Sequence, residues 1–347
     1  TKPTQHSVGR LREIGISPDI LLCRTEIRIT KEQREKIALF CNVDYEAVIE
    51  AADAKHIYEV PLMLKKEGLD NLILKKLNIK RTDKDLKDWR DFVVKRVKNP
   101  THEVKIAVVG KYIALPDAYK SVYEALVHAG IAHDTRVNII KIDSEDLEKN
   151  KKIKALENVQ GILIPGGFGD RGIEGKINAV QYARENKIPY FGICLGMQIA
   201  CIEFARNVCN LKGANSTEFN KTTKYPIISL LEEQKDVKEL GATMRLGAYP
   251  CNINKKSLAY KAYGKDLISE RHRHRYEFNN DFREQFIKEG MQFSGMNSQH
   301  GLVEVIELTD HPWFVACQFH PEFKSKPDRA HPLFAAFIEA ALALKKK

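Results

Sequence analysis

A regular alternation of two kinds of segment between residues 104 and 207 restricts the fold of this chain more than any other feature. Short, nearly continuous apolar runs resemble strands that are buried on both faces of a parallel sheet. Helix-like segments separate these runs. This order predicts an α/β fold with a doubly wound, mostly parallel sheet. The strand-like runs are 104–112, 136–142, 161–167 and 188–193.

Strand-like segments dominate the chain after about residue 225, and an apolar helix pattern at 331–344 closes it. We therefore expect residues 104–347 to form one domain. The strand-like segments are 225–231, 242–253, 269–278, 292–297, 302–308 and 313–321.

Residues 1–79 do not follow this alternation. The chain begins without a methionine and soon reaches a strand-like stretch, residues 16–25, for which the chain offers no obvious sheet partner. A helix pattern follows at 31–41 and a short apolar pattern at 60–77. We interpret 1–79 as the C-terminal fragment of a larger domain.

Residues 80–103 read as a helical linker between these two parts. Apolar residues recur there at helical spacing, and Asn99-Pro100 ends the run. The residues at that spacing are Leu86, Trp89, Val93 and Val97.

The overall charge restricts the partners. The net charge is +10, but the 56 lysines and arginines are interleaved with 46 acidic residues, which argues against a nucleic-acid partner and fits anionic small substrates equally well. Seven scattered cysteines form neither a disulfide framework nor a zinc-like spacing. No apolar run approaches ~20 residues and no signal peptide opens the chain, so we expect a cytoplasmic protein without a membrane segment.

Cys194 stands at a sharp corner between a strand and a helix, framed by Gly192 and Gly196. The glycines remove side chains that would block neighbouring backbone, as in the nucleophile elbow of hydrolases. The following helix directs its positive end at the sulfur, which favours thiolate, and the amide of Leu195 faces a developing oxyanion. The alternative is a buried structural cysteine, but the corner favours a nucleophile.

A cysteine nucleophile needs a base, and the base needs an orienting group. His320 and Glu322 are two residues apart at the end of an extended apolar strand, so they are expected to project to the same side. Glu322 can then accept the imidazole N–H and leave the other ring nitrogen for the proton of Cys194. The alternative is a histidine with a structural hydrogen bond at a strand end.

The glycine-rich segment 163–172 follows another predicted strand. Its exposed N–H groups can supply the second donor of an oxyanion hole, with Gly167 the best placed. It lacks the GK[ST] of a P-loop and the GxGxxG spacing of a dinucleotide fold, so phosphate binding is the poorer interpretation.

These three motifs together resemble the class I, triad-type glutamine amidotransferases, and the flanking sequence resembles the CTP synthase family over essentially the whole chain. The resemblance implies a flavodoxin-like amidotransferase domain preceded by a partial α/β amidoligase (synthetase) domain. The segments that carry it are the opening TKPTQHSV, GGFGDRG (166–172), FGICLGMQ (191–198), NSTEF (215–219), TMRLGA (243–248), RHRHRYEFN (271–279) and His320-Pro321-Glu322.

The resemblance implies that Cys194 attacks the side-chain amide of glutamine and releases ammonia, with His320 as base and then acid and Glu322 as its orienting group. A free acid and a fork-shaped cation suit the ammonium and carboxylate ends of glutamine. Arg275 could instead belong to a charged strand face with Arg271 and Arg273. The positions implied to hold glutamine are Gly167, Leu195, Gly196, Met197, Gln198, Glu218 and Arg275.

The resemblance also implies that the complete enzyme passes ammonia to a synthetase domain, where ATP and Mg²⁺ activate UTP for conversion to CTP and GTP acts as allosteric activator. The magnesium carboxylates of the family are absent from this chain, so it should not make CTP unaided. Dimers or tetramers are implied. The positions implied to bind nucleotides are Lys2, Pro3, Thr4, Gln5, Lys36 and Asp53.

Two other functions are compatible with the motifs. One is a stand-alone glutaminase or γ-glutamyl hydrolase, against which the nucleotide-binding tail argues. The other is a regulatory or filament-forming module with a spent site, against which the intact triad argues. His272 and His274 could suggest a metal, but the adjacent arginines would repel one, so no metal site is expected.

Overall fold

The computed structural model describes residues 1–80, 85–115, 117–149, 154–230 and 244–346. The chain divides into two compact units, Thr1–Asn99 and Pro100–Lys347. Part of the predicted linker, 81–84, and Thr243 of the TMRLGA segment lie outside the described residues. The linker boundaries themselves stay a prediction.

The first unit pairs β1 (Leu21–Thr25) with β2 (Val48–Ala52) in a two-stranded parallel sheet. The expectation that the first strand has no partner in the chain was therefore wrong, because the short β2 was not recognised. A small core around Val8, Ile37 and Val48 joins these strands to the helices. The helices are α1 (Lys2–Glu13), α2 (Lys31–Cys41), α3 (Val60–Lys66), α4 (Leu69–Lys76), a π-helical turn (Trp89–Val94) and α5 (Lys95–Lys98).

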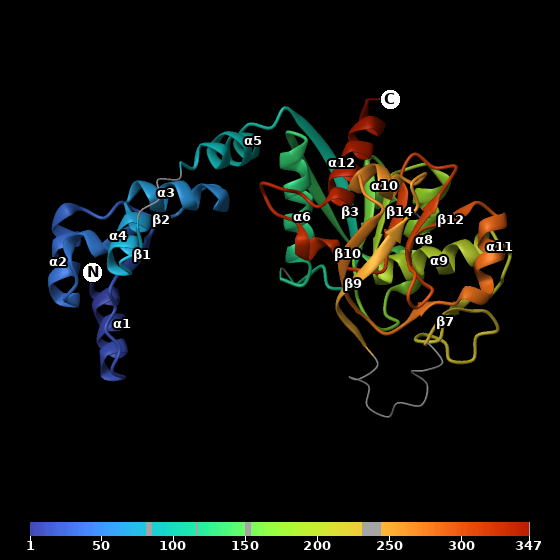
Figure 1. The fold of residues 1–347 in the computed structure, drawn as a ribbon, viewed down its shortest axis with the longest axis horizontal. Coiled ribbons are helices and arrows are strands. Elements are labelled where there is room, and N and C mark those ends of the chain that lie inside the picture. Colours follow the sequence, from blue (N-terminus) through green and yellow to red (C-terminus); the bar gives the residue numbers. More distant parts are fainter. Residues whose placement is uncertain (81–84, 116, 150–153, 231–243, 347) are drawn as a thin grey trace. The chain divides into compact units, whose positions relative to one another are not determined.

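The second unit contains a nine-stranded sheet in the order β10-β9-β12-β13-β14-β6-β5-β3-β4. Figure 1 labels several of these strands. Five neighbouring strands, β4, β3, β5, β6 and β14 in that spatial order, are mutually parallel. Their order corresponds to the order 2-1-3-4-5 of a flavodoxin-like sheet. The rest of the sheet is antiparallel. The strands are β3 (His102–Gly110), β4 (Thr135–Asp143), β5 (Gly161–Ile164), β6 (Tyr190–Ile193), β9 (Arg245–Ile253), β10 (Leu267–His274), β12 (Met291–Asn297), β13 (Leu302–Leu308) and β14 (Phe314–Cys317).

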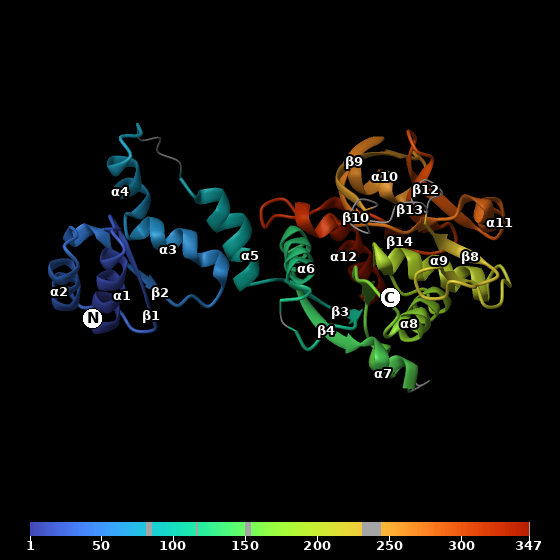
Figure 2. The same ribbon diagram turned by 90° about the horizontal axis from the view of Figure 1, so that it is seen from below.

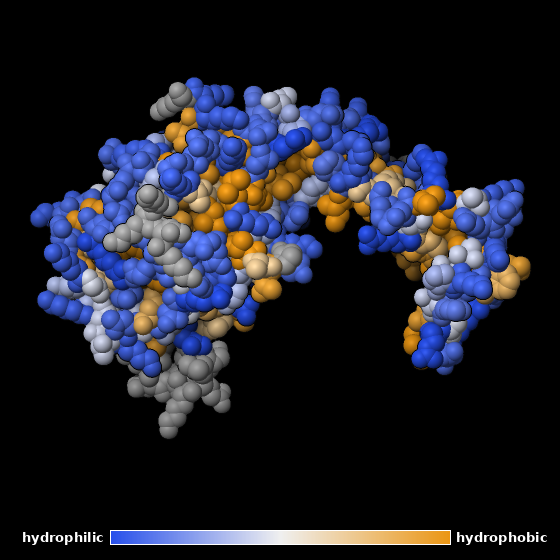
Figure 3. All heavy atoms as spheres, turned by 180° about the vertical axis from the view of Figure 1, so that it is seen from behind, coloured by the Kyte–Doolittle hydropathy of each residue, from blue (hydrophilic) through white to orange (hydrophobic). Residues whose placement is uncertain are grey.

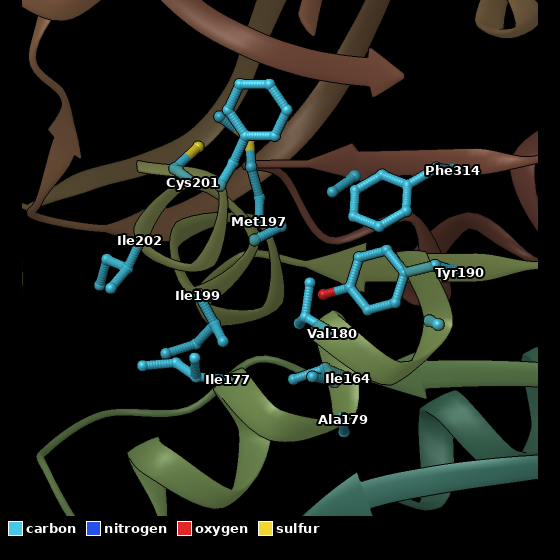
Figure 4. Packing of buried hydrophobic residues seen from close by; sticks show 14 of the residues in the cluster. Ile164, Ile177, Ala179, Val180, Tyr190, Met197, Ile199, Cys201, Ile202 and Phe314 are labelled. Carbon is cyan, nitrogen blue, oxygen red and sulfur yellow. The ribbon is translucent and has the colours of Figure 1, made fainter. Parts of the chain in front are cut away.

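Helices cover both faces of this sheet, as the view in Figure 2 shows. One buried cluster joins α8 and α9 to one face, and a second joins α6 and α12 to the other. In Figure 4, side chains of α8 and α9 meet Ile164, Tyr190 and Phe314 of three adjacent strands. The helices are α6 (Lys120–Ala132), α7 (Ser144–Lys149), α8 (Ile173–Glu185), α9 (Leu195–Asn207), α10 (Leu258–Tyr263), α11 (Arg283–Lys288) and α12 (Pro332–Lys345).

The predicted doubly wound α/β fold is confirmed, and the later strand-like segments turn out to extend the same sheet. The segments β7 (Asn215–Ser216), β8 (Pro226–Ser229) and β11 (Glu277–Phe278) form a separate small sheet instead. This small sheet carries the loop that leads to Glu218.

Much of the face in Figure 3 is hydrophilic, with hydrophobic residues gathered toward the middle of the second unit. Among the described residues, no helix combines the length and the apolar character that a membrane crossing requires.

Candidate active site

Cys194 occupies the corner between β6 and α9 in a strained backbone conformation, with φ 51° and ψ −101°. The corner is compact because a Cβ on Gly192 would lie 2.8 Å from the carbonyl carbon of Gly196, and a Cβ on Gly196 would lie 2.2 Å from the carbonyl oxygen of Ile164. The hydroxyl of Tyr190 donates to the carbonyl oxygen of Gly196 at 2.8 Å. The two glycines thus allow the close approach that the motif predicted.

We expect Gly196→Ala to disrupt this corner, because the added Cβ would overlap a backbone oxygen that cannot move alone. The expected loss is about 3 kcal/mol in the free energy of unfolding, or roughly 6–12 °C in Tm. Thermal unfolding measures it. Gly9→Ala is the matched control, since a Cβ there meets nothing within 4 Å. An unchanged Tm for Gly196→Ala would show that the corner tolerates a side chain.

His320 and Glu322 form a short hydrogen bond, 2.7 Å from Nδ1 to Oε1. The predicted reason for this contact, alternation along one strand, was wrong: β14 ends at Cys317, and Glu322 lies in the 3₁₀ turn Pro321–Lys324. The turn, rather than strand alternation, therefore brings the carboxylate to the ring. The backbone N–H of His320 donates to the carbonyl oxygen of Arg271 at 2.7 Å, which ties the loop to β10.

The surroundings of His320 favour its protonated form. Burial opposes the charge, but the neighbouring Cys194 and the hydrogen-bonded Glu322 outweigh it and raise the pKa of His320 to about 10. Gly166 makes room for this ring, since a Cβ there would lie 2.8 Å from His320 Cε1 and 3.6 Å from Cys194 Cβ. The loop after β5 therefore packs against the cysteine and the histidine together.

A cavity of about 270 Å³ opens on Cys194. Its lining residues lie up to 109 positions apart in the chain. Glu218 and Arg275 are among them and contribute a carboxylate and a guanidinium group. Glu218 also accepts a hydrogen bond from the backbone N–H of Gly169 at 2.8 Å, so this carboxylate orders the glycine-rich loop. The lining residues are Gly167, Phe168, Cys194, Gln198, Glu218, Met244, His274, Arg275 and Tyr276.

Four of the seven residues predicted to hold glutamine line this cavity: Gly167, Gln198, Glu218 and Arg275. The side chains of Leu195 and Met197 are buried in the protein core, and Gly196 packs against Ile164. Leu195 is the first residue of α9, so its N–H has no acceptor within the helix and is available to an oxyanion. The roles of these residues stay predictions.

The arginines and histidines of β10 lie on opposite faces. Arg271 and Arg273 are exposed, whereas His272 and His274 are buried and hydrogen-bonded to each other at 2.9 Å. Burial, reinforced by Arg245, lowers the pKa of His272 to about 3, so its ring is neutral. Among the described residues, no group of three or more His, Cys, Asp or Glu side chains is placed to fit Mg²⁺ or another metal.

The residues predicted to bind nucleotides lie in the first unit. Lys2, Pro3, Thr4 and Gln5 form the first turn of α1, and Lys36 lies on α2. Asp53 follows β2, pairs with Arg24 at 3.0 Å and lines a separate cavity of about 550 Å³. The structure thus places Asp53, but not the α1 turn or Lys36, in the wall of that cavity.

Sequence reasoning missed several cavity residues and one contact of the cysteine. Phe168, Met244, His274 and Tyr276 line the cavity beside predicted residues. Gln318 donates from Nε2 to Cys194 Sγ at 3.6 Å. Its place two residues before His320 was the only local signal.

Comparisons with known families agree with the division of motifs along the chain. Residues 114–340 match the family model described as glutamine amidotransferase class-I, and residues 1–79 match the model described as CTP synthase N-terminus. The glutaminase domain of Trypanosoma brucei CTPS, in a structure with bound acivicin, is 41% identical with a TM-score of 0.66. That match covers 69% of this chain and 94% of the trypanosomal domain.

Curated relatives match along the whole chain. CTP synthase of Carboxydothermus hydrogenoformans is 60% identical over 346 residues, and that of Geobacter sulfurreducens is 57% identical over 348 residues. Both matches cover 100% of this chain, which spans 64% and 65% of the lengths of these relatives. The resemblance and the amidotransferase fold inferred from the motifs are therefore confirmed. The chain belongs to the CTP synthase family, and its residues 114–340 belong to the class I glutamine amidotransferases.

Proposed function

We propose that this chain hydrolyses L-glutamine and releases ammonia, with Cys194 as nucleophile, His320 as acid and base, and Glu322 as the group that orients His320. The observation that carries the proposal is the cavity that Cys194, Glu218 and Arg275 line together. Family membership supports the same reaction.

In the first half of the reaction, the Cys194 sulfur attacks the side-chain amide carbon of glutamine. The N–H groups of Leu195 and Gly167 stabilise the oxyanion. When the C–N bond breaks, the His320 imidazolium gives its proton to the departing nitrogen, which leaves as ammonia. A water molecule then attacks the thioester, with neutral His320 accepting its proton, and glutamate departs as the C–S bond breaks.

The charges of the cavity suit the amino-acid end of glutamine. Glu218 matches the α-ammonium and Arg275 the α-carboxylate, while Gly167 and Gln198 border the side chain. Leu195, Gly196 and Met197 form the first turn of α9 behind Cys194. Glu218 has a second duty, because it also fixes the Gly169 backbone. The Glu218 carboxylate would therefore both bind the α-ammonium of glutamine and hold the glycine-rich loop at Gly169.

We expect Glu218→Gln to raise KM for glutamine about tenfold or more while kcat falls less, because a charge-assisted hydrogen bond to the ammonium is lost. Initial rates of ammonia release over a glutamine series measure the two constants. Glu174→Gln is a matched control, since that carboxylate is exposed on α8 and pairs with Arg206. If KM stays unchanged, Glu218 does not hold the ammonium.

In a protein of the relatives' full length, we propose that the ammonia serves ATP-dependent amination of UTP to CTP, with Mg²⁺ as cofactor and GTP as allosteric activator. Such a protein would be a cytoplasmic, glutamine-hydrolysing ligase of pyrimidine biosynthesis that assembles as a dimer or tetramer. Residues 1–79 would end the synthetase domain, 80–103 would link it to the amidotransferase domain 104–347, and Lys2, Pro3, Thr4, Gln5, Lys36 and Asp53 would contact UTP, CTP or ATP. The match of residues 1–79 to the CTP synthase N-terminus supports this division.

A stand-alone glutaminase or γ-glutamyl hydrolase is not favoured, because such an enzyme has no use for residues 1–79. The test measures glutamate and ammonia from glutamine with this chain. Equal amounts of both products are expected, and absence of ammonia would overturn the proposal. A change of rate with UTP or GTP would favour the synthetase-coupled enzyme, whereas indifference to both would favour the stand-alone alternative.

A further inference from the structure

Gln318 follows β14 and lays its side-chain amide against the Cys194 sulfur in the interior of the second unit. Nε2 donates to Sγ at 3.6 Å, and the side chain is fully buried. The backbone N–H of Gln318 donates to the carbonyl oxygen of Glu304 at 2.9 Å. The β14–β13 pairing therefore continues one residue past the strand and sets the direction in which the Gln318 side chain leaves the sheet.

The orientation of this amide follows from its neighbours. Gln198 Nε2 lies 3.1 Å from the carbonyl oxygen of Tyr276, which can only accept, so the nitrogen of Gln198 must face it. The same nitrogen lies 3.2 Å from Gln318 Oε1. Reversing the Gln318 amide would set two NH₂ groups against each other. The carbonyl of Tyr276 thus determines, through Gln198, that Gln318 presents its N–H to Cys194.

We propose that Gln318 is a second hydrogen-bond donor to the Cys194 sulfur during catalysis, alongside His320; this inference rests on the proposed glutamine hydrolysis. The two donors differ in kind. His320 gives its proton to the departing ammonia, whereas a primary amide does not ionise and keeps its N–H throughout the cycle. When the thioester is hydrolysed and the C–S bond breaks, the electron pair returns to Sγ, where the Gln318 N–H stabilises the charge.

A donor to sulfur has two opposite effects on reactivity. It raises the fraction of thiolate at low pH, but it lowers the nucleophilicity of each thiolate. Removing the donor should therefore slow reaction of Cys194 at low pH and leave it equal or faster once the thiol is fully ionised. A purely structural role for Gln318 would not produce such a crossing of the two pH profiles.

The experiment measures alkylation of Cys194 by iodoacetamide, in which the sulfur forms a bond to carbon and iodide leaves. It uses the 347-residue chain, over about pH 5–10, with the modified peptide quantified by mass spectrometry. The variants are Gln318→Met, which removes the donor at similar volume, and Gln318→Glu, which keeps an acceptor for Gln198 and places a carboxylate near Sγ. We expect the rate of alkylation at low pH to fall roughly tenfold for Gln318→Met and further for Gln318→Glu. The pH midpoint of the alkylation profile should rise in the same order.

Gln285→Met is the control, because Gln285 donates to the carbonyl oxygen of Cys209 and not to the active-site sulfur. Superimposable profiles of the wild type and both Gln318 variants would overturn the inference. A smaller loss of alkylation in Gln318→Glu than in Gln318→Met would also overturn it, because loss of packing alone predicts that order. If Gln318→Met does not fold, Gln318→Leu takes its place in the same assay, because it also removes the donor without adding a charge. The proposed glutaminase function fails separately, if the wild-type chain releases no ammonia from glutamine.

Discussion

Replacing Cys194 with alanine is expected to abolish ammonia release from glutamine, with a loss of about 10⁴-fold or more, because Cys194 is the proposed nucleophile of the covalent step. The cysteine is the cavity residue at the strained corner, and the positive φ places its sulfur beside His320. In a protein of the relatives' full length, CTP formation from free ammonia should survive the change while glutamine-dependent formation vanishes. Ammonia release and CTP formation with each nitrogen donor are the measurements.

Cys201→Ala is the matched control for this experiment. Cys201 lies on the same helix, is fully buried in the core of Figure 4, and burial raises the pKa of its thiol, so it is an unreactive cysteine. Its replacement should leave glutamine hydrolysis nearly unchanged at a modest cost in stability. If Cys194→Ala abolished CTP formation from free ammonia as well as from glutamine, the proposed assignment of glutamine hydrolysis to one part and CTP formation to the other would be wrong.

The second large effect is expected for His320→Gln, which removes the proposed acid for departing ammonia and the proposed base for the attacking water. We expect kcat to fall roughly 10³-fold with little change in KM, because the imidazole acts in the transition state. Steady-state kinetics measure both constants. His311→Gln provides a buried-histidine control: its ring bonds the carbonyl oxygen of Ala183 at 3.2 Å, and burial lowers the pKa of His311 to about 4. Equal losses in the two variants would point to stability rather than chemistry.

The pH dependence gives a further test of the pair. The proposed hydrolysis needs the His320 imidazolium, so activity should fall as pH rises through the His320 pKa of about 10. Glu322→Gln keeps an acceptor for Nδ1 but removes the negative charge that favours the imidazolium. The His320 pKa should drop, and the alkaline limb should move down by about 1–3 pH units. An alkaline limb that stays in place would show that Glu322 does not control the charge of His320.

Several features of this protein could be predicted from short stretches of sequence. The alternation of buried strands and helices predicted the doubly wound fold, because each layer is built from local periodicity. The corner at Cys194 could be recognised because Gly192 and Gly196 are needed within four residues of it, where backbone approaches within 3 Å leave no space for a Cβ. The His320–Glu322 pair was predicted because the two residues are only two positions apart, although a 3₁₀ turn rather than a strand brings them together.

Some features that depend on contacts between distant segments were not predicted. The short β2 completes a parallel pair with β1 without a strong strand pattern of its own. Gly196 and Met197 share the motif with Gln198, but only Gln198 faces the cavity, because the rotation of α9 against the sheet decides which side chains point outward.

Local sequence determined which side chains have the chemistry for amide cleavage and which fold carries them, since glycine spacing and apolar periodicity act over a few residues. The tertiary structure alone decided which groups face the sulfur and the cavity. Gln318 and Cys194 are 124 positions apart, and their contact exists because β14 and β6 pair in parallel and end at the same edge of the sheet. Sequence spacing does not encode that register, whereas packing of the two strands does.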